Sequence, residues 1–321
     1  TAKVVVVNTG NTIMGDDGIL QSLYNGFPLT GGERVVIKIS GNSASNDGLD
    51  FSDSPNRYFY VGSITNVLIK EEKETFTLNL VSREAITNET IRVGKRFPTS
   101  QKISDSVKDI CKNYLSSDKL YDVDETQNPY GFIGNMKKPF TVITWLASKS
   151  VPSTVSDGDA TAGYFFFEAQ KGFRFKSIDQ LIDQEPYEKK YVYTPGIVEY
   201  KGARNDFKIL EYSTSKNQNL LDNLERGAYC SHRKYLNPLT FEYTPAPQTI
   251  FKLDDYSGKI KNLGGDINVT LPTLSNKDTR TLASVPSRYI TGILDVGTIE
   301  NDVSFDKNAD PTKIHSQAMM R

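Results

Sequence analysis

The sequence is poor in the residues that most often carry chemistry. Its 321 residues include only 2 cysteines, 2 histidines and 1 tryptophan. Cys111 and Cys230 are too few and too far apart for a disulfide framework, which fits synthesis in a reducing compartment, and both are interpreted as ordinary thiols. His232 and His315 do not form a pair with zinc-ligand spacing, so no zinc site is expected.

Net charge is also nearly absent. With 38 basic and 39 acidic residues the formal charge is -1, which excludes a global attraction to nucleic acid or to an anionic membrane. No apolar run approaches the roughly 20 residues that span a bilayer, and residues 1–10 lack the pattern of a signal peptide. We therefore expect a soluble protein that recognises partners by shape. Because position 1 is Thr rather than Met, we also expect the sequence to be a trimmed piece.

Three short stretches imitate chemical motifs without completing them. Residues 10–15 have the glycine spacing of a phosphate loop, but Asp16 and Asp17 replace the required Lys and Ser/Thr. Residues 41–45 lack the final glycine of a nucleophile elbow, and residues 157–159 lack the further carboxylates of a calcium loop. We therefore expect no catalytic, cofactor-binding or metal-binding residues. A catalytic pair of carboxylates like that of a glycosidase is neither predicted nor excluded, because only the distance between two carboxylates in the folded protein identifies such a pair.

The first 98 residues have the patterning of β-structure. Alternation through residues 35–39 and residues 75–80 predicts strands with one buried face each. Residues 58–61 and 64–69 lack strict alternation, as expected for strands covered on both sides or entering a closed barrel. We predict a small antiparallel barrel or sandwich over residues 1–98.

One segment of this first region is a candidate binding loop. Residues 40–56 are rich in Ser, Asn, Asp and Gly and are expected to form a long exposed loop between two strands. Long ordered loops often bind a partner. The candidate protein-interface residues are Asn46, Asp47, Asp50 and Asp53. A solvated loop without a partner is the alternative interpretation.

Residues 99–190 are predicted to form an α+β domain. Apolar residues at helical spacing over residues 103–115 include Cys111, and a second helix is expected over residues 139–147, where proline suits the first turn. Ser177 stands three residues before Gln180, the spacing of a capping box that begins another short helix.

A phenylalanine-rich hairpin is expected just before that short helix. A three-residue loop over residues 170–172 would place Phe167 opposite Phe175 and Glu168 opposite Arg174. One face of the hairpin would then be a phenylalanine ladder, which we expect to pack on the helix predicted before it.

Residues 191–321 are predicted to form a second β domain, with an inserted loop and β segment at about residues 245–285. A helix over residues 219–226 is expected to end at Gly227, a favourable residue beyond a helix C-terminus. The strand-like runs are residues 208–212, 239–243 and 289–294.

Three stretches, in this order, resemble the baseplate central hub proteins of T-even-like contractile-tailed phages. They are Ser-Asp-Ser-Val-Lys-Asp-Ile at residues 104–110, the phenylalanine-rich hairpin at residues 163–179, and Asn-Leu-Leu-Asp-Asn-Leu-Glu-Arg-Gly-Ala-Tyr-Cys-Ser at residues 219–231. The resemblance covers roughly residues 30–240 and, more loosely, the remainder. Type VI secretion spike proteins share this hub architecture but fuse the spike onto it, and the separate phage hub is favoured.

The resemblance implies a structural protein rather than an enzyme. It implies two tube-like antiparallel β-barrel domains that flank an α+β domain and form a pseudo-sixfold ring as a homotrimer. Such a ring would dock on the hexameric tail tube, hold a trimeric cell-puncturing spike with a lysozyme domain, contact other baseplate wedge proteins, and let genomic DNA pass without specific binding. The implied location is the tail baseplate of the virion, assembled in the host cytoplasm.

Two other functions remain as alternatives. A β-rich, aromatic chain also suits a glycan-binding or fibre-attachment module of the baseplate. A hydrolase within residues 99–190 is the third hypothesis, because 39 acidic residues leave many pairings possible.

Overall fold

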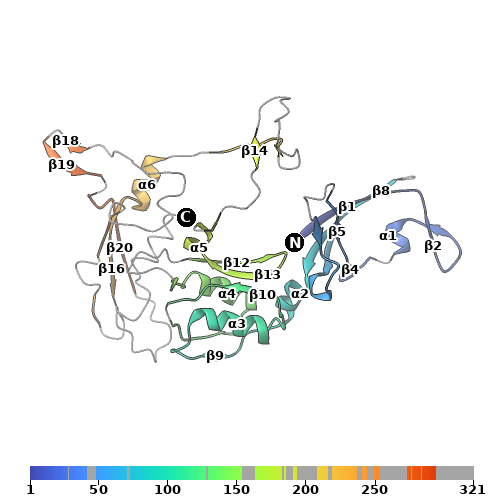
Figure 1. Cartoon of the computed structure of the whole chain (residues 1–321), viewed down its shortest axis with the longest axis horizontal. Helices are drawn as coiled ribbons and strands as arrows, with labels where there is room; N and C mark the ends of the chain where they lie inside the picture. The colour runs from blue at the N-terminus through green and yellow to red at the C-terminus, as the bar shows by residue number, and fades with distance from the viewer. Residues whose placement is uncertain are drawn as a thin grey trace. The chain divides into compact units, whose positions relative to one another are not determined.

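The computed structural model divides the chain into two compact units and is mainly β (Figure 1). Unit 1 comprises Thr1–Ile91 and Leu115–Lys119, and unit 2 comprises Arg92–Tyr114 and Leu120–Arg321. The division into three domains near residues 98 and 190 stays a prediction. The structure describes residues 1–27, 29–41, 48–70, 73–127, 129–153, 163–182, 184–185, 191–193, 208–215, 219–236, 241–243, 249–252, 273–275, 277–282 and 284–293.

A four-stranded antiparallel sheet forms the centre of unit 1. Its strands lie in the order β1 (Ala2–Thr9), β8 (Lys73–Ser82), β7 (Phe59–Ile69) and β4 (Arg34–Val35). Alternation in β8 buries Phe76 and Leu80, as residues 75–80 predicted. In the described part of the chain this sheet is open and does not close into a barrel.

The irregular pattern of residues 58–69 has a different cause from the one expected. These residues lie largely in the single strand β7, whose register against β8 shifts twice, between Val61 and Ser63 and between Thr65 and Leu68. Asn66, in the second shift, has a φ of 57°. An inserted residue twists a strand and reverses which side chains face the core, so bulges rather than burial on both faces break the alternation.

The remaining elements of unit 1 are short. They are β2 (Ile13–Met14), β3 (Leu20–Gln21), α1 (Leu23–Gly26), β5 (Lys38–Ile39), β6 (Leu49–Asp50), the 3₁₀ turn η1 (Pro55–Arg57) and α2 (Arg83–Thr90). The strand predicted over residues 35–39 is split between β4 and β5. The expectation of a long loop over residues 40–56 is also wrong at its far end, because β6 pairs with β5.

Residues 115–119 belong to unit 1 because buried polar contacts hold them there. The carboxylate of Glu84 is fully buried, and it accepts hydrogen bonds from the ammonium of Lys119 at 2.8 Å and the hydroxyl of Ser117 at 2.9 Å. The guanidinium of Arg83 donates to the carbonyl oxygen of Ser116 at 2.8 Å. A buried carboxylate is stable only when it is paired and hydrogen-bonded, which this arrangement provides.

The first part of unit 2 packs two helices against a three-stranded sheet, as Figure 1 shows. The sheet has the order β10 (Leu120–Val123), β13 (Gly172–Ser177) and β12 (Tyr164–Ala169). The helices predicted near residues 103–115 and 139–147 are confirmed as α3 (Ile103–Asn113) and α4 (Pro139–Ala147). Burial of apolar side chains between the two helices and the sheet holds these layers together. The buried side chains of the two helices include Ile103, Val107, Ile110, Cys111, Val142, Ile143 and Leu146.

The predicted hairpin is present, but its register differs by one residue. Gln170 and Lys171 alone form the turn, so Phe166 lies opposite Phe175, and Arg174 lies opposite Phe167 rather than Glu168. Gly172 has a φ of 137° and is the first residue of the returning strand, not the last residue of the loop.

The observed register gives the hairpin a different aromatic face. Tyr164, Phe166, Phe173 and Phe175 share it, and the ring of Phe140 from α4 lies 5.8 Å from that of Phe166. The prediction that an aromatic face of the hairpin packs on α4 is therefore confirmed. The side chains on that face differ from the predicted ones, because Phe166 rather than Phe167 lies on it. The hydroxyl of buried Tyr164 donates to the carbonyl oxygen of Glu125 at 2.9 Å, a bond that the predicted register would forgo by turning Tyr164 to the opposite face.

The helix that begins at Ser177 is confirmed as α5 (Ile178–Ile182). The hydroxyl of Ser177 accepts from the main-chain N–H of Gln180 at 3.2 Å. Burial by itself lowers the pKa of Lys176, the preceding residue, but ion pairs with Asp122 at 2.7 Å and Asp124 at 2.9 Å outweigh burial and raise that pKa.

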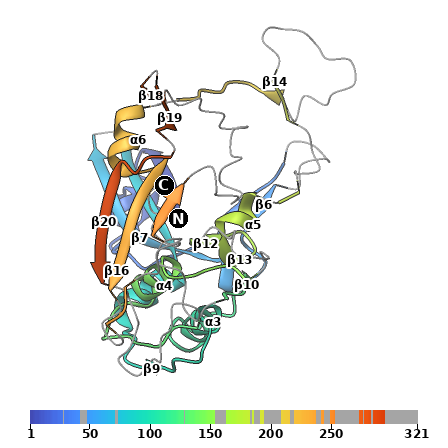
Figure 2. The ribbon, with the colours of Figure 1, turned by 90° about the vertical axis from the view of Figure 1, so that its left-hand side faces the viewer.

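The later part of unit 2 contains a sheet in which β16 (Cys230–Leu236) lies between β17 (Ile250–Lys252) and β20 (Arg288–Ile293). Figure 2 shows β16 and β20 side by side, with α6 (Leu220–Arg226) near one end. The predicted helix end is confirmed, since Gly227 has a φ of 74°.

Only some of the strands predicted in this region are present at the predicted residues. Residues 289–293 fall on β20, and residue 294 lies outside the described residues, whereas residues 208–212 contain only β15 (Lys208–Ile209), paired with β14 (Val192–Tyr193). Of residues 239–243, Tyr243 makes one isolated bridge, and residues 239 and 240 lie outside the described residues. The other strands of unit 2 are β9 (Arg96–Phe97), β11 (Phe132–Ile133), β18 (Thr273–Ser275) and β19 (Asp278–Thr281). Among the described residues, no helix is long and apolar enough to cross a membrane.

Candidate assembly surface

The strand β1 leaves one of its edges open. It pairs with β8 over eight residues, from Ala2 opposite Leu80 to Thr9 opposite Lys73, and no described strand pairs with its other edge. Four consecutive valines at residues 4–7 favour an extended strand, because β-branched side chains pack well on a pleated surface. A long, apolar edge strand is a template for pairing with another chain.

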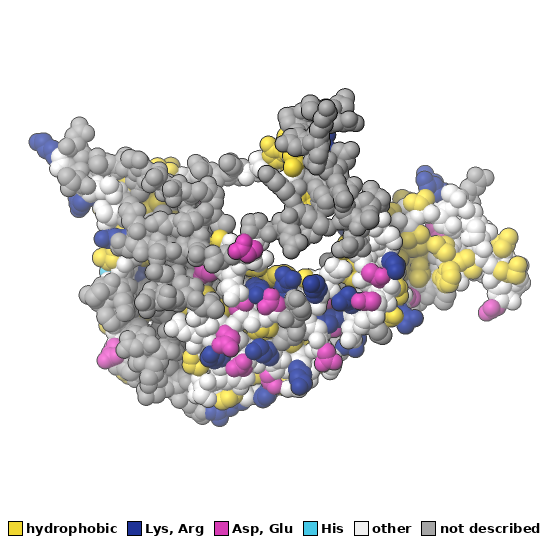
Figure 3. Space-filling model, in the orientation of Figure 1, with side chains coloured by type: hydrophobic (Ala, Val, Ile, Leu, Met, Phe, Trp, Pro, Cys, Tyr) yellow, Lys and Arg dark blue, Asp and Glu magenta, His cyan; other side chains and the backbone are white. Residues whose placement is uncertain are grey.

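The outer face of the same sheet is apolar at one end. Val5 is 63% exposed and Val7 is 56% exposed, while Val4 and Val6 turn inward. Thr75 lies opposite both Val7 in β1 and Leu68 in β7, and Leu68 is 62% exposed. Figure 3 shows hydrophobic side chains gathered on this part of unit 1. We call the edge of β1 together with Val5, Val7 and Leu68 the assembly surface; contiguous apolar exposure of this kind marks interaction sites.

The other edge of the sheet is also partly open. The short strand β4 pairs only with Phe59 and Tyr60 of β7, and main-chain bonds to Glu33 and Gly32 extend the contact to Val61. No described strand pairs with the rest of that edge, up to Ile69. One sheet therefore offers two open edges on opposite sides.

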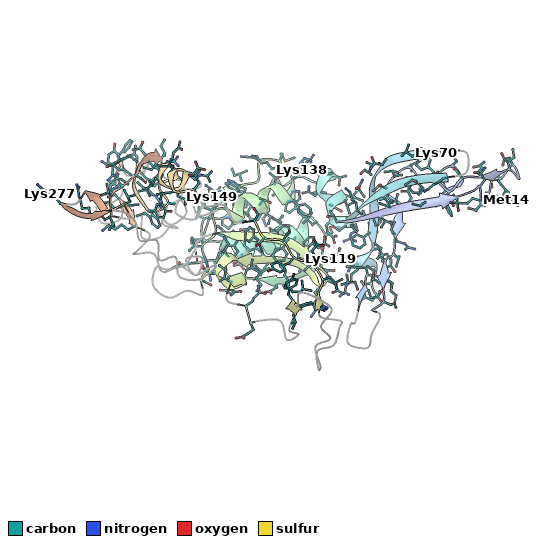
Figure 4. The ribbon with its side chains drawn as sticks, turned by 90° about the horizontal axis from the view of Figure 1, so that it is seen from above. Met14, Lys70, Lys119, Lys138, Lys149 and Lys277 are labelled. Carbon is teal, nitrogen blue, oxygen red and sulfur yellow. The ribbon has the colours of Figure 1, made fainter. Side chains whose placement is uncertain are left out.

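A short arm formed by β2, β3 and α1 extends this surface. Buried Glu74 in β8 holds the arm, because its carboxylate accepts from the Ser22 hydroxyl at 3.3 Å and the Tyr24 main-chain N–H at 3.1 Å. Figure 4 places Met14 at the tip of the arm, where its side chain is 72% exposed. A pocket of 770 Å³ lies between the arm and the end of the β7–β8 hairpin, which carries Lys70.

The predicted interface residues are only partly described. Asn46 and Asp47 lie outside the described residues. Asp50 lies in β6, 3.0 Å from the ammonium of Lys38, and Asp53 lies 2.8 Å from the guanidinium of Arg57. Both acids are therefore engaged within unit 1, and their role in binding a partner stays a prediction.

The environment of Asp50 favours its charged form. The hydroxyl and then the main-chain N–H of Ser52 donate to its carboxylate, and Lys38 adds a nearby positive charge. These contacts lower the pKa of Asp50 from 3.8 to about 2. A hydrogen-bonded carboxylate of this kind stabilises the β5–β6 strand pair and the residues just after β6, rather than preparing a proton transfer.

Of the three incomplete chemical motifs, only residues 10–15 are fully described; residues 42–45 and 157–159 lie outside the described residues. Residues 10–15 run from the end of β1 into the β2–β3 ribbon rather than into a helix, and Asp17 accepts a hydrogen bond from the main-chain N–H of Ile19. Cys111 and Cys230 are buried thiols. Among the described residues, no three His, Cys, Asp or Glu side chains are grouped to hold a metal ion.

One sequence feature of the assembly surface, a run of valines, was not used in the sequence analysis. The valine run at residues 4–7 was a strand signal. Its open edge could not be inferred, because the neighbouring strand β8 lies some 70 residues further along the chain. Comparison with known proteins adds no family: no family model matches the chain, and no curated protein is significantly similar to it.

Proposed function

We propose that this protein is a structural hub in the baseplate of a contractile phage tail. As a homotrimer it would adapt the hexameric tail tube to a trimeric cell-puncturing spike and surround the channel for DNA. The resemblance of residues 104–110, 163–179 and 219–231 to hub proteins names this function. The assembly surface is the observation that supports it, since a protein whose role is assembly needs surfaces that complement one another between copies rather than a reaction centre.

The two open edges of one sheet are suited to a ring. The free edge of β1 in one copy can continue the sheet at the free part of β7 in the next, which is a head-to-tail interface. Head-to-tail interfaces close into rings when the rotation between copies is suitable. Strand pairing between copies would close the open sheets into the wall of a tube, so two tube-like domains in each of three subunits would give the pseudo-sixfold ring.

The near-zero net charge agrees with a channel that lets DNA pass. A wall that neutralised many phosphates would bind the polymer tightly, because each neutralised phosphate releases counterions. The formal charge of -1 provides no such excess of cations.

Mass photometry of the whole chain tests the proposal. We expect a species of three times the 35.9 kDa chain mass, which forms larger complexes when a contractile-tail tube protein or spike protein is added. A species that stays monomeric at high concentration and forms no complex with either the tube protein or the spike protein would contradict the hub role. Glycan binding by that monomer would instead support the fibre-attachment alternative, and clearing of a cell-wall suspension would support the hydrolase.

A further inference from the structure

Unit 2 contains a second, smaller pocket that is separate from the assembly surface. It has a volume of 320 Å³ and lies between β11, the turn that follows it, and α4. Typical ligand pockets start at about 300 Å³, so this one has room for a side chain or two rather than for a large ligand. The pocket is lined by Phe132, Ile133, Gly134, Asn135, Lys137, Thr141, Val142 and Trp145.

A tight turn fixes one wall of this pocket. The main-chain N–H groups of Gly134 and Met136 donate to the carbonyl oxygens of Lys95 at 3.1 Å and Val93 at 3.0 Å. A Cβ atom at Gly134 would lie 2.3 Å from the Val93 oxygen, so only glycine fits there. Asn135 and Met136 then adopt φ values of 50° and 55°, a conformation that is unfavourable for methionine. The turn is thus held in one shape, with Met136 exposed beside the pocket.

The opposite wall is aromatic and rigid. The ring of Trp145 lies 5.5 Å from those of both Tyr130 and Phe132, in edge-to-face geometry, and Phe132 stacks on Phe97 at 4.4 Å. Despite these contacts Trp145 stays 39% exposed. A tryptophan fixed by its neighbours but open to solvent is typical of the residues that dominate binding at protein interfaces.

The rim of the pocket carries positive charge. Lys137 lines it, while Lys138, just before α4, and Arg96, opposite Ile133 in the β9–β11 ribbon, already have interactions of their own. Figure 4 marks Lys138 at this end of α4. None of the lining residues is Asp or Glu. An apolar pocket with Lys137 at its rim complements an apolar side chain that stands next to a carboxylate.

We propose that this pocket binds an acidic segment of a partner protein, which inserts one aromatic or leucine side chain against Trp145. A carboxylate of the segment lies against Lys137, and the anchor of the segment fills the space above Phe132 and Val142. This inference rests on the pocket itself and does not require the hub function or trimer formation.

Trp145 is the only tryptophan, so its fluorescence reports on the pocket directly. The probe is the capped hexapeptide acetyl-Glu-Asp-Leu-Phe-Glu-Asp-amide, titrated against the whole chain at low salt. We expect a blue shift of emission with a Kd on the order of 100 μM, weakened about tenfold in 0.5 M salt because the rim contacts are screened. One control peptide replaces Leu and Phe with Ser, and another replaces the acids with Lys; neither should shift the emission.

Variants separate binding at this pocket from binding elsewhere. Lys137→Glu should weaken the peptide at least about fivefold, and Thr141→Phe should abolish the shift by filling the cavity. Lys112→Glu on α3, a residue that does not line the pocket, should leave binding unchanged. Circular dichroism confirms that each variant is folded.

Several results would overturn the proposal. They are no emission shift with up to about 1 mM acidic peptide, which is far weaker than specific peptide recognition, an equal shift with the lysine peptide, or unchanged binding in the folded Lys137→Glu variant. Tight binding of an uncharged apolar dye without any response to the acidic peptide would instead indicate a small-molecule pocket. None of these readouts depends on the oligomeric state, so the hub proposal can fail while this one stands.

Discussion

The Oδ2 atom of Asp124 lies 2.8 Å from the main-chain nitrogen of Ser177, where β13 ends and α5 begins. In a capping box this N–H would donate to the side chain three residues into the helix. Gln180 instead accepts from the ammonium of Lys176 at 3.1 Å. The helix start therefore depends on a residue that is 53 positions away in sequence.

Replacing Asp124 should destabilise unit 2 substantially. Asp124→Ala removes the acceptor for the Ser177 N–H and one partner of Lys176, all in a buried position. We expect a loss of about 2–4 kcal/mol in the free energy of unfolding, measured by urea denaturation. Asp122→Ala is the matched control, because that carboxylate also pairs with Lys176 but is more exposed; its cost should stay below about 1 kcal/mol. Equal losses in the two variants would contradict this role.

The buried pair of Glu84 and Lys119 should behave as a coupled unit. Glu84→Gln leaves the Lys119 ammonium without its charged partner and should cost about 3 kcal/mol of stability, and Lys119→Met should cost a similar amount. The double variant should cost clearly less than the sum, because neither charge is then buried alone. Additive losses in a double-mutant cycle would show that the pair is not coupled.

Asp50 should titrate well below an ordinary aspartate. Because its folded-state pKa is about 2 and its ordinary value is 3.8, its charged form stabilises the fold above about pH 4. That contribution is lost as the pH falls through about 2. Carboxyl carbon chemical shifts measured by NMR should give this pKa directly. Ser52→Ala should move it up toward 3.8, and an unchanged pKa in that variant would show that Ser52 is not the cause.

The assembly surface should be sensitive to charge. The double variant Val5→Lys and Val7→Lys adds two cations to exposed positions, so stability should change by less than about 1 kcal/mol, while pairing with another copy should be blocked. Mass photometry should then show monomers. Val36→Lys, which alters an exposed valine between β4 and β5, is the control and should keep the wild-type assembly. A double variant that assembles normally would exclude this surface from the interface.

Local chemistry made part of the fold predictable. Proline at the first turn of α4, serine before α5 and glycine after α6 are end signals that act within a few residues. The apolar stripe of α3 likewise needs no information from elsewhere in the chain. For this reason α3, α4, α5 and α6 were found close to their observed positions, whereas α1 and α2 fall in the region predicted to be β-structure and were missed.

Strand register and sheet edges were not predictable in the same way. Both possible registers of the hairpin gave an aromatic face, and the choice was made by partners outside it, namely the Glu125 carbonyl for Tyr164 and the Phe140 ring for Phe166. The candidate loop was misjudged because β5 finds its pairing partner across the polar segment. The apolar pocket beside Trp145 depends on a turn and a helix that are brought together only by folding.

The return of residues 115–119 to unit 1 means that the backbone passes between the two units three times, at residues 91–92, 114–115 and 119–120. A single proteolytic cut at 114–115 or 119–120 leaves residues of both units on one fragment, and a cut at 91–92 releases residues 1–91 but leaves residues 115–119 on the fragment that carries unit 2. No single truncation point yields either unit alone. A chain cut after residue 91 would lack residues 115–119, and with them the Lys119 ammonium that neutralises Glu84. Producing unit 1 apart from unit 2 requires a rearranged coding sequence in which residues 115–119 follow residue 91 through a new linker.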